Sequence, residues 1–167
     1  ILLYNLSMNI FVLDNDPKLC AQQHLDKHVV KMILESAQMV CTTHHIHPNK
    51  DIKYEIPYRK SFVNHPCTKW VRSSISNYEW LTNLTKELNN EYRYRYGKKI
   101  NHKSFDVIKN LPLPDLPDIG LTSWARAMPD ECKIEGDVIK SYRNYYQLRK
   151  QKIMKYTKRK IPSWITV

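Results

Sequence analysis

The longest amphipathic pattern in the chain runs from Pro17 to Thr43 and contains no glycine. At 100° per residue its apolar side chains cover well over half of a helix circumference, which is typical of a largely buried helix. Asn15, Asp16 and Pro17 form a helix-entry signal, with Asp16 as N-cap and Pro17 in the first turn. The pattern predicts one long core helix. Its apolar positions are Ala21, Leu25, Val29, Val30, Met32, Ile33, Leu34, Ala37, Met39 and Val40.

A narrow polar stripe interrupts this apolar surface. Four of its members recur at spacings of three or four residues, which places their side chains on one helix face. A titratable stripe on a buried helix predicts the lining of a cleft. The alternative is a solvent-facing stripe in which Lys31 and Glu35 form an ion pair. The stripe consists of His24, Lys27, His28, Lys31, Glu35 and Gln38.

A second apolar stripe runs from Pro66 to Tyr96 and predicts a second long core helix. Asn64 or His65 is its expected cap. Gly97 is its expected stop, because glycine readily adopts the left-handed conformation that ends a helix.

The remaining segments are shorter. Residues 44–64 lack a sustained period and are expected to form a loop, and the proline-rich residues 111–120 form a connector. We expect a short helix over residues 104–110, one or two helical turns over residues 122–128, and a last helix over residues 136–155.

Composition supports a helical globular protein. The 167 residues are 42% hydrophobic and 26% charged, and three glycines are few for an all-β fold with many tight turns. The predicted fold is therefore one compact all-α domain over residues 1–167, with two long core helices, a shorter C-terminal helix and long proline-rich loops. Ile1 is not a natural start, so residues 1–7 are interpreted as an extension or upstream sequence and Met8 as the first plausible initiator.

Cysteine use and hydropathy predict a cytoplasmic protein that does not enter a membrane, in a host cell if the source is a phage or virus. No apolar run approaches 18 residues and no signal peptide is recognisable. The loop histidines have no carboxylate or cysteine at ligand spacing, so we expect no metal site and no cofactor. Four widely spaced cysteines are expected to be reduced core thiols, namely Cys20, Cys41, Cys67 and Cys132.

The formal net charge of +11 predicts a polyanionic partner. Charge alone does not separate nucleic acid from acidic lipid, but residues 140–167 interleave basic and aromatic side chains, which suits distorted or unpaired nucleic acid. The alternative is a solvated basic tail with core tyrosines. The candidate contacts to nucleic acid are Gln23, Lys27, His28, Arg72, Arg143, Tyr145, Arg149, Lys150, Lys152, Lys155, Lys158, Arg159 and Trp164.

Three stretches carry a family resemblance. MNIFVLDNDPKLCAQQHL, which begins at Met8, resembles the amino terminus of the pyrimidine-dimer DNA glycosylase family, bacteriophage endonuclease V. HLDKHVVKMILESAQ is similar to the first helix of small relatives in that family, and NHPCTKWVRSSISNYEWL is similar to their second helix. The resemblance covers roughly half of the chain and implies that His65 and Trp70 begin the second core helix.

The resemblance implies a single all-α domain that removes a damaged base with its N-terminal amine and then cleaves the strand through an imine. It also implies that Gln23 and His24 lie in the DNA-contacting cleft. The family has an essential glutamate seven residues after the histidine, where this chain has Lys31. Either Glu35 takes over that role, or Lys31 itself supplies the amine, or the chain has no glycosylase activity.

These observations predict a nucleic-acid-binding protein, with DNA favoured over RNA. The candidate activity is a DNA N-glycosylase/lyase acting on a damaged or modified pyrimidine, with Glu35, Lys31 and His24 as catalytic residues. The alternative is a non-catalytic nucleic-acid-binding component of a viral or ribonucleoprotein assembly.

Overall fold

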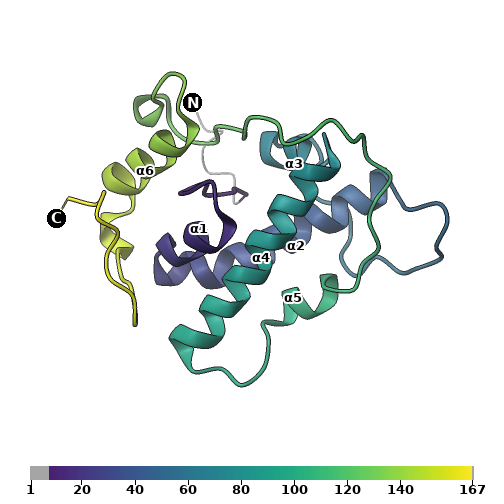
Figure 1. The fold of residues 1–167 in the computed structure, drawn as a ribbon, viewed down its shortest axis with the longest axis horizontal. Helices are drawn as coiled ribbons and strands as arrows, with labels where there is room; N and C mark the ends of the chain where they lie inside the picture. The colour runs from purple at the N-terminus through teal and green to yellow at the C-terminus, as the bar shows by residue number, and fades with distance from the viewer. Residues whose placement is uncertain (1–7, 167) are drawn as a thin grey trace.

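The computed structural model describes residues 8–166, which form a helical fold without a strand in that range. Figure 1 shows α2 and α4 crossing at the centre, with α6 and the C-terminal segment to one side. The predicted all-α fold is confirmed. The α-helices are α1 (Pro17–Gln23), α2 (Asp26–Ile46), α3 (Pro66–Val71), α4 (Ile75–Tyr96), α5 (Lys103–Ile108) and α6 (Val138–Arg149), with short 3-10 turns η2 (Asp130–Cys132) and η3 (Gln151–Ile153).

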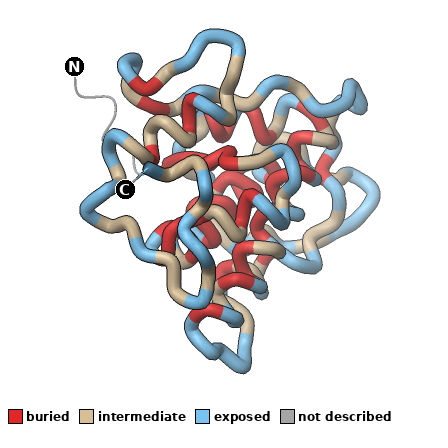
Figure 2. The backbone as a smooth tube through the Cα atoms, turned by 60° about the vertical axis from the view of Figure 1, so that its left-hand side comes forward, coloured by how far each residue is buried: buried red, intermediate tan, exposed pale blue. Residues whose placement is uncertain are grey.

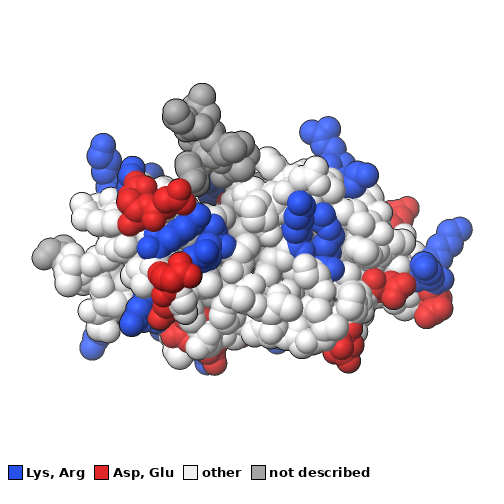
Figure 3. Space-filling model, turned by 90° about the horizontal axis from the view of Figure 1, so that it is seen from above, with Lys and Arg blue, Asp and Glu red and all other residues white. Residues whose placement is uncertain are grey.

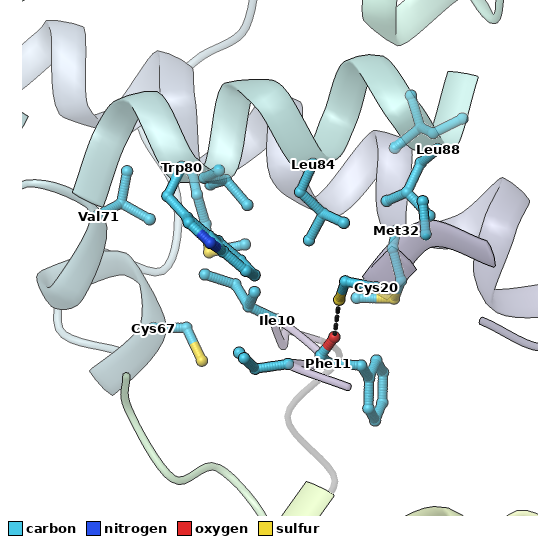
Figure 4. Packing of buried hydrophobic residues seen from close by; sticks show 14 of the residues in the cluster. Ile10, Phe11, Cys20, Met32, Cys67, Val71, Trp80, Leu84 and Leu88 are labelled. Carbon is cyan, nitrogen blue, oxygen red and sulfur yellow. Dashed lines mark hydrogen bonds between the residues drawn. The ribbon is translucent and has the colours of Figure 1, made fainter. Parts of the chain in front are cut away.

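An extended segment over residues 8–13 lies inside the helical core rather than on its surface. All six of its residues are buried, and Figure 2 shows the buried positions concentrated in the middle of the fold. The Cys20 thiol donates a hydrogen bond to the Phe11 carbonyl oxygen over 3.2 Å, which ties α1 to this segment (Figure 4). The four cysteines are buried free thiols, as predicted.

The first predicted helix is two helices. The expected continuous helix over residues 17–43 is wrong at His24 and Leu25, where the backbone becomes extended. The Arg95 guanidinium accounts for the break, because it donates to the carbonyl oxygens of His24 at 2.6 Å and Gln22 at 2.9 Å. The predicted cap is confirmed, since the Asp16 side chain accepts from the first-turn backbone.

The second predicted helix also divides. Residues 72–74 separate α3 from α4, and Ser74 provides a new N-cap. The Asn77 side chain stabilises the break, because its amide donates to the Trp70 carbonyl oxygen at 2.8 Å. Both predicted ends are confirmed: the His65 side chain caps α3, and Gly97 ends α4 with φ of +62°.

Two shorter predictions need correction. Residues 122–128 are not helical, because distant side chains take their backbone groups: Asn77 accepts from the Thr122 N–H and Tyr142 donates to the Ala125 carbonyl oxygen. The last helix, α6, ends at Arg149 rather than near residue 155.

The C-terminal tail is held against the core by a buried ionic cluster, here called the tail clamp: Asp26, Glu91, Arg95, Thr157 and Arg159. Arg95 has a fully buried side chain and donates to Glu91 at 2.8 Å and to Asp26 at 3.2 Å. Arg159 donates to the other oxygen of Glu91 at 2.6 Å, and Thr157 donates to Asp26 through its hydroxyl and its backbone N–H. The clamp therefore fixes the tail to the start of α2 and the end of α4.

Candidate active site

Glu35 lies on α2 and is the one stripe carboxylate. Its residue is 4% exposed, and its Oε2 atom has no hydrogen-bond partner among residues 8–166. Burial raises the pKa of this carboxyl to about 7, against the opposing effects of the Lys31 charge, a hydrogen bond from the Asn9 backbone and the Lys150 charge. A carboxyl with a pKa near 7 can both hold and release a proton at neutral pH.

Asn9 brings the extended N-terminal segment against this carboxyl. The side-chain amide of Asn9 donates to the Ala127 carbonyl oxygen at 2.8 Å, and its oxygen accepts from the Tyr142 hydroxyl at 3.1 Å. These bonds hold the residue in place, and its backbone lies near enough to Glu35 to lower the pKa of that carboxyl. We call this pair the Asn9–Glu35 centre.

Two lysines surround the centre with positive charge. The Lys31 Nζ atom lies 4.0 Å from Glu35 Oε2, and its side chain is 57% exposed. Lys150, just past the end of α6, is half-buried and lies over the ring of Tyr145, with 4.7 Å from Nζ to the centroid. Burial and the Lys31 charge lower the pKa of Lys150, while Glu35 acts in the opposite direction.

A cavity of about 640 Å³ opens beside the same segment, and we call it the Asn9 cavity. Met8 and Asn9 form part of its wall, and Tyr145 links it to Lys150. Arg126 and Lys133 add basic groups to its lining, although each is near an acidic partner, Glu135 and Asp130 respectively. The remaining lining comes from residues 62–66 and from Ala127 and Met128.

The structure does not place His24 in a cleft, although the sequence predicted it there. The ring is fully buried, and its Nδ1 lies 2.7 Å from the Cys20 carbonyl oxygen. Burial, followed by the Arg95 charge, lowers the pKa of His24 to about 4, so the ring is neutral near pH 7. The interruption of the helix after Gln23 explains the difference, because it turns His24 out of the register of the stripe.

His28 is also part of the core rather than a surface contact. Its ring stacks on Phe11 with centroids 4.3 Å apart, and Nδ1 lies 2.7 Å from the Tyr146 hydroxyl oxygen. Burial and the charges of His24, Lys150 and Lys31 lower the pKa of His28 to about 2. The predicted stripe is therefore not one surface. Lys31 and Glu35 lie close together, whereas His24 and His28 are buried in the core.

Several predicted nucleic-acid contacts bind other parts of the protein. Gln23 accepts from the Trp164 indole at 2.8 Å and donates to Asp14, and Arg143 donates to the Leu13 carbonyl oxygen at 2.9 Å. Arg143 also lies over the Trp164 ring. These residues hold the chain end against α1 and the segment before it.

Other predicted cations have intramolecular partners too. Arg149 pairs with Glu131, Arg159 with Glu91, and Arg72 donates to the Val63 carbonyl oxygen at 2.7 Å. The Lys158 ammonium donates to the Tyr94 carbonyl oxygen. The predicted cations that are exposed to solvent include Lys27, Lys31, Lys152 and Lys155. Figure 3 shows basic side chains in separate groups on one face, some directly flanked by acidic ones.

The predicted loop over residues 44–64 begins later than expected, because His44 and His45 lie in the last turn of α2 and His47 follows it as the C-cap. His44 is buried between the hydroxyls of Tyr54 and Tyr78, at 2.7 and 2.8 Å. No group of three or more potential metal ligands occurs within residues 8–166. No helix in this part of the chain is both long and apolar enough to span a membrane.

Sequence reasoning missed Asn9 as a component of the site. Asn9 affects the pKa of Glu35 through its backbone, and any residue type at this position would present the same backbone group. The one available signal was the MNIFVLD segment of the resemblance, which begins one residue before Asn9.

Comparison with known proteins gives one match. The family model described as pyrimidine dimer DNA glycosylase matches residues 8–104, which is more than half of the chain. The matched region includes both members of the Asn9–Glu35 centre, whereas Lys150 and the C-terminal tail lie beyond it. No curated protein and no solved structure matches the chain significantly.

Proposed function

The chain belongs to the pyrimidine dimer DNA glycosylase family, and from that membership we propose that it removes a pyrimidine at a dimer in DNA through an imine formed at the Asn9–Glu35 centre. Membership implies a DNA substrate. The specific lesion, the nucleophile and the role of each residue are parts of the proposal.

One observation carries the proposal: a buried carboxyl with an unpartnered oxygen lies near enough to the Asn9 backbone for that backbone to affect its pKa. In a chain that begins at Asn9, the backbone nitrogen of this residue is a primary amine. Amines of this kind are the nucleophiles of imine-forming enzymes, and a neighbouring acid/base group makes them effective. An acid/base group with a pKa near 7 contributes about 10²–10⁴ in rate.

The spacing of the chain supports Glu35 in this role. The resemblance implies a glutamate seven residues after a histidine, and counting from His24 leads to Lys31. Counting from His28 leads to Glu35. Because Lys31 is exposed and Glu35 is buried beside Asn9, the second alignment gives the glutamate the environment that its chemistry needs.

The proposed reaction has two stages. The amine nitrogen bonds to C1′ of the deoxyribose as the bond from C1′ to the pyrimidine breaks, and the base leaves with that electron pair. The amine passes a proton to the departed base, the sugar ring opens as its oxygen takes a proton from Glu35, and a protonated imine joins protein and DNA. Glu35, now a carboxylate, takes a proton from C2′, and the 3′ phosphate leaves with the electrons of its broken bond.

The surroundings suit a duplex that has been opened. An enzyme that reacts at a sugar or base must take a nucleotide out of the stack, and the Asn9 cavity provides a space adjoining the centre for such a nucleotide. Lys31 and Lys150 supply the positive charge that attracts the DNA backbone.

Borohydride trapping tests both the reaction and the nucleophile. A chain made to begin at Asn9 by removal of a cleavable tag is expected to form a trapped adduct with a pyrimidine-dimer duplex. Peptide mapping is expected to place the DNA on Asn9. The same chain with its amine acetylated is the matched control and is expected to form no adduct.

Lysine variants separate the alternatives. Lys31→Met and Lys150→Met are expected to retain trapping. An adduct that maps to either lysine would refute the assignment of the amine, and absence of any adduct with dimer duplexes would refute the proposed activity.

A further inference from the structure

Phe62 combines exposure with an unfavourable backbone conformation. Its φ angle is +48°, in the left-handed region that residues with a Cβ atom seldom adopt. Its residue is nevertheless 38% exposed, so core packing of the ring does not account for the conformation. Backbone strain of this kind persists where the surrounding structure imposes it, and it is concentrated at functional sites.

Hydrogen bonds on both sides of Phe62 impose the conformation. The Thr42 hydroxyl donates to the Ser61 carbonyl oxygen at 2.9 Å and accepts from the Ser61 N–H at 3.0 Å. On the other side, the Arg72 guanidinium donates to the Val63 carbonyl oxygen at 2.7 Å. The Phe62 carbonyl oxygen itself accepts from the His65 N–H at 3.1 Å. Arg72, predicted to contact nucleic acid, thus positions this loop.

The wall of the Asn9 cavity includes Phe62. Phe62 lines the cavity while part of its surface stays open to solvent, and Met8 and Asn9 line the same cavity. Two exposed basic residues, Arg59 and Lys60, precede it on the loop. An exposed aromatic ring, a cavity and nearby cations form the combination that binds an unstacked nucleotide and its phosphates.

We propose that Phe62 is a stacking residue that enters the base stack of dimer-containing DNA and takes the place of a nucleotide extruded into the Asn9 cavity. The inference rests on the proposed function, because it assumes a duplex at the Asn9–Glu35 centre. It adds a residue that recognises distorted DNA by stacking, independently of the chemistry at Glu35. Rigid presentation of the ring lowers the entropic cost of its insertion.

The test uses substitutions that separate the ring from the backbone conformation. Phe62→Gly removes the ring and tolerates the left-handed backbone, so Tm is expected to stay unchanged or rise. Phe62→Trp keeps an aromatic face. Ile52→Ala is the matched control, because Ile52 is 51% exposed, lies on the same loop and does not line the cavity.

Affinity is measured with dimer-containing duplexes in protein that also carries Glu35→Gln, so that the DNA is not consumed. Phe62→Gly is expected to weaken binding about tenfold or more, whereas Phe62→Trp and Ile52→Ala stay within about threefold of the parent. A 2-aminopurine placed beside the dimer is expected to gain fluorescence with the parent, because it unstacks, and to gain much less with Phe62→Gly.

The outcomes distinguish this inference from the proposed function. If the wild-type chain cleaves dimer DNA and Phe62→Gly binds as the parent does, the inference alone is refuted. If the chain binds dimer DNA without cleaving it and Phe62→Gly loses that binding, the proposed activity fails and the stacking role stands. If the protein neither binds nor cleaves dimer DNA, both are refuted.

Discussion

The Asn9–Glu35 centre and the tail clamp both contain buried carboxylates on the long helices, but they differ in how many hydrogen-bond partners these carboxylates have. Asp26 and Glu91 of the clamp accept hydrogen bonds from arginines and Thr157. Glu35 keeps one oxygen without a partner and has its nearest ammonium 4.0 Å away.

The pKa values follow this difference in partners. Burial alone would raise the pKa of Asp26 and of Glu91, but hydrogen bonds from Thr157 and Arg95 to Asp26, and from Arg159 and Arg95 to Glu91, lower both. At Glu35 burial dominates and the pKa rises to about 7. Burial of a carboxylate therefore does not mark a reactive site by itself. A reactive site is indicated instead by a buried carboxylate whose hydrogen bonds and neighbouring charges do not offset the effect of burial on its pKa.

Removal of Arg95 is expected to have the largest effect on stability. Arg95→Met leaves Asp26 and Glu91 buried without their shared cation, which typically costs about 3–5 kcal/mol. Tm is expected to fall by on the order of 10 °C in a thermal melt. Arg126→Met is the control, because its partner Glu135 is almost fully exposed and the pair contributes at most about 1 kcal/mol. Equal losses for the two variants would contradict the role of the clamp.

The two sites are expected to give stability opposite dependences on pH. Because the pKa of Glu35 is raised from 4.5 to about 7 on folding, the unfolded chain binds fewer protons there, and this residue lowers stability as pH rises through that window. Glu35→Gln is expected to stabilise the protein at pH 8 by up to about 3 kcal/mol and to change little at pH 4. Denaturant unfolding at both pH values measures this, and a variant less stable than wild type at pH 8 would contradict the account.

The carboxylates of the tail clamp give stability the opposite dependence on pH, because they stabilise the fold more as pH rises. Asp26 and Glu91 have lowered pKa values, so their contribution is present above their unfolded values of 3.8 and 4.5 and is lost as pH falls through the folded values. The same unfolding series is expected to show acid destabilisation that is smaller in Glu91→Gln than in wild type.

The smallest effects are expected from single tail cations. Lys152 and Lys155 are exposed, and replacing each with Gln is expected to reduce the slope of log K against log salt by about one for each phosphate that is no longer neutralised. Arg159→Gln is the comparison, since Arg159 binds Glu91 and its loss is expected to lower Tm while the slope is unchanged. DNA binding measured at several salt concentrations shows which cations contact phosphates. A slope that changes only with Arg159→Gln would contradict the assignment of Lys152 and Lys155 as phosphate contacts.

The sequence predicted the features that depend on neighbouring residues. Asp16 and Pro17 start α1, Gly97 ends α4, and the apolar stripes identify the core faces of α2 and α4. The helix breaks were not predictable in this way, because their stabilising groups come from elsewhere. Arg95 reaches the His24 carbonyl oxygen from 71 residues along the chain.

The same distinction applies to the candidate site. Glu35 and Lys31 were predicted as neighbours because an i,i+4 spacing on a helix fixes their proximity. His24 was placed with them by assuming that the helix was continuous, and the family resemblance also implied a position in the cleft. The contribution of Asn9 could not be predicted from composition or periodicity, because it is made by a backbone group brought to α2 by the fold of the extended segment.

We propose that Glu35, and neither carboxylate of the clamp, is the acid/base group of a DNA glycosylase. The most direct measurement is the single-turnover rate of dimer-strand cleavage against pH, for wild type and for Glu35→Gln, with a chain that begins at Asn9. We predict an inflection near pH 7 in wild type, and a rate about 10² or more lower, without that inflection, in the variant. A Glu35→Gln protein that cleaves at the wild-type rate with the same pH profile would contradict the account.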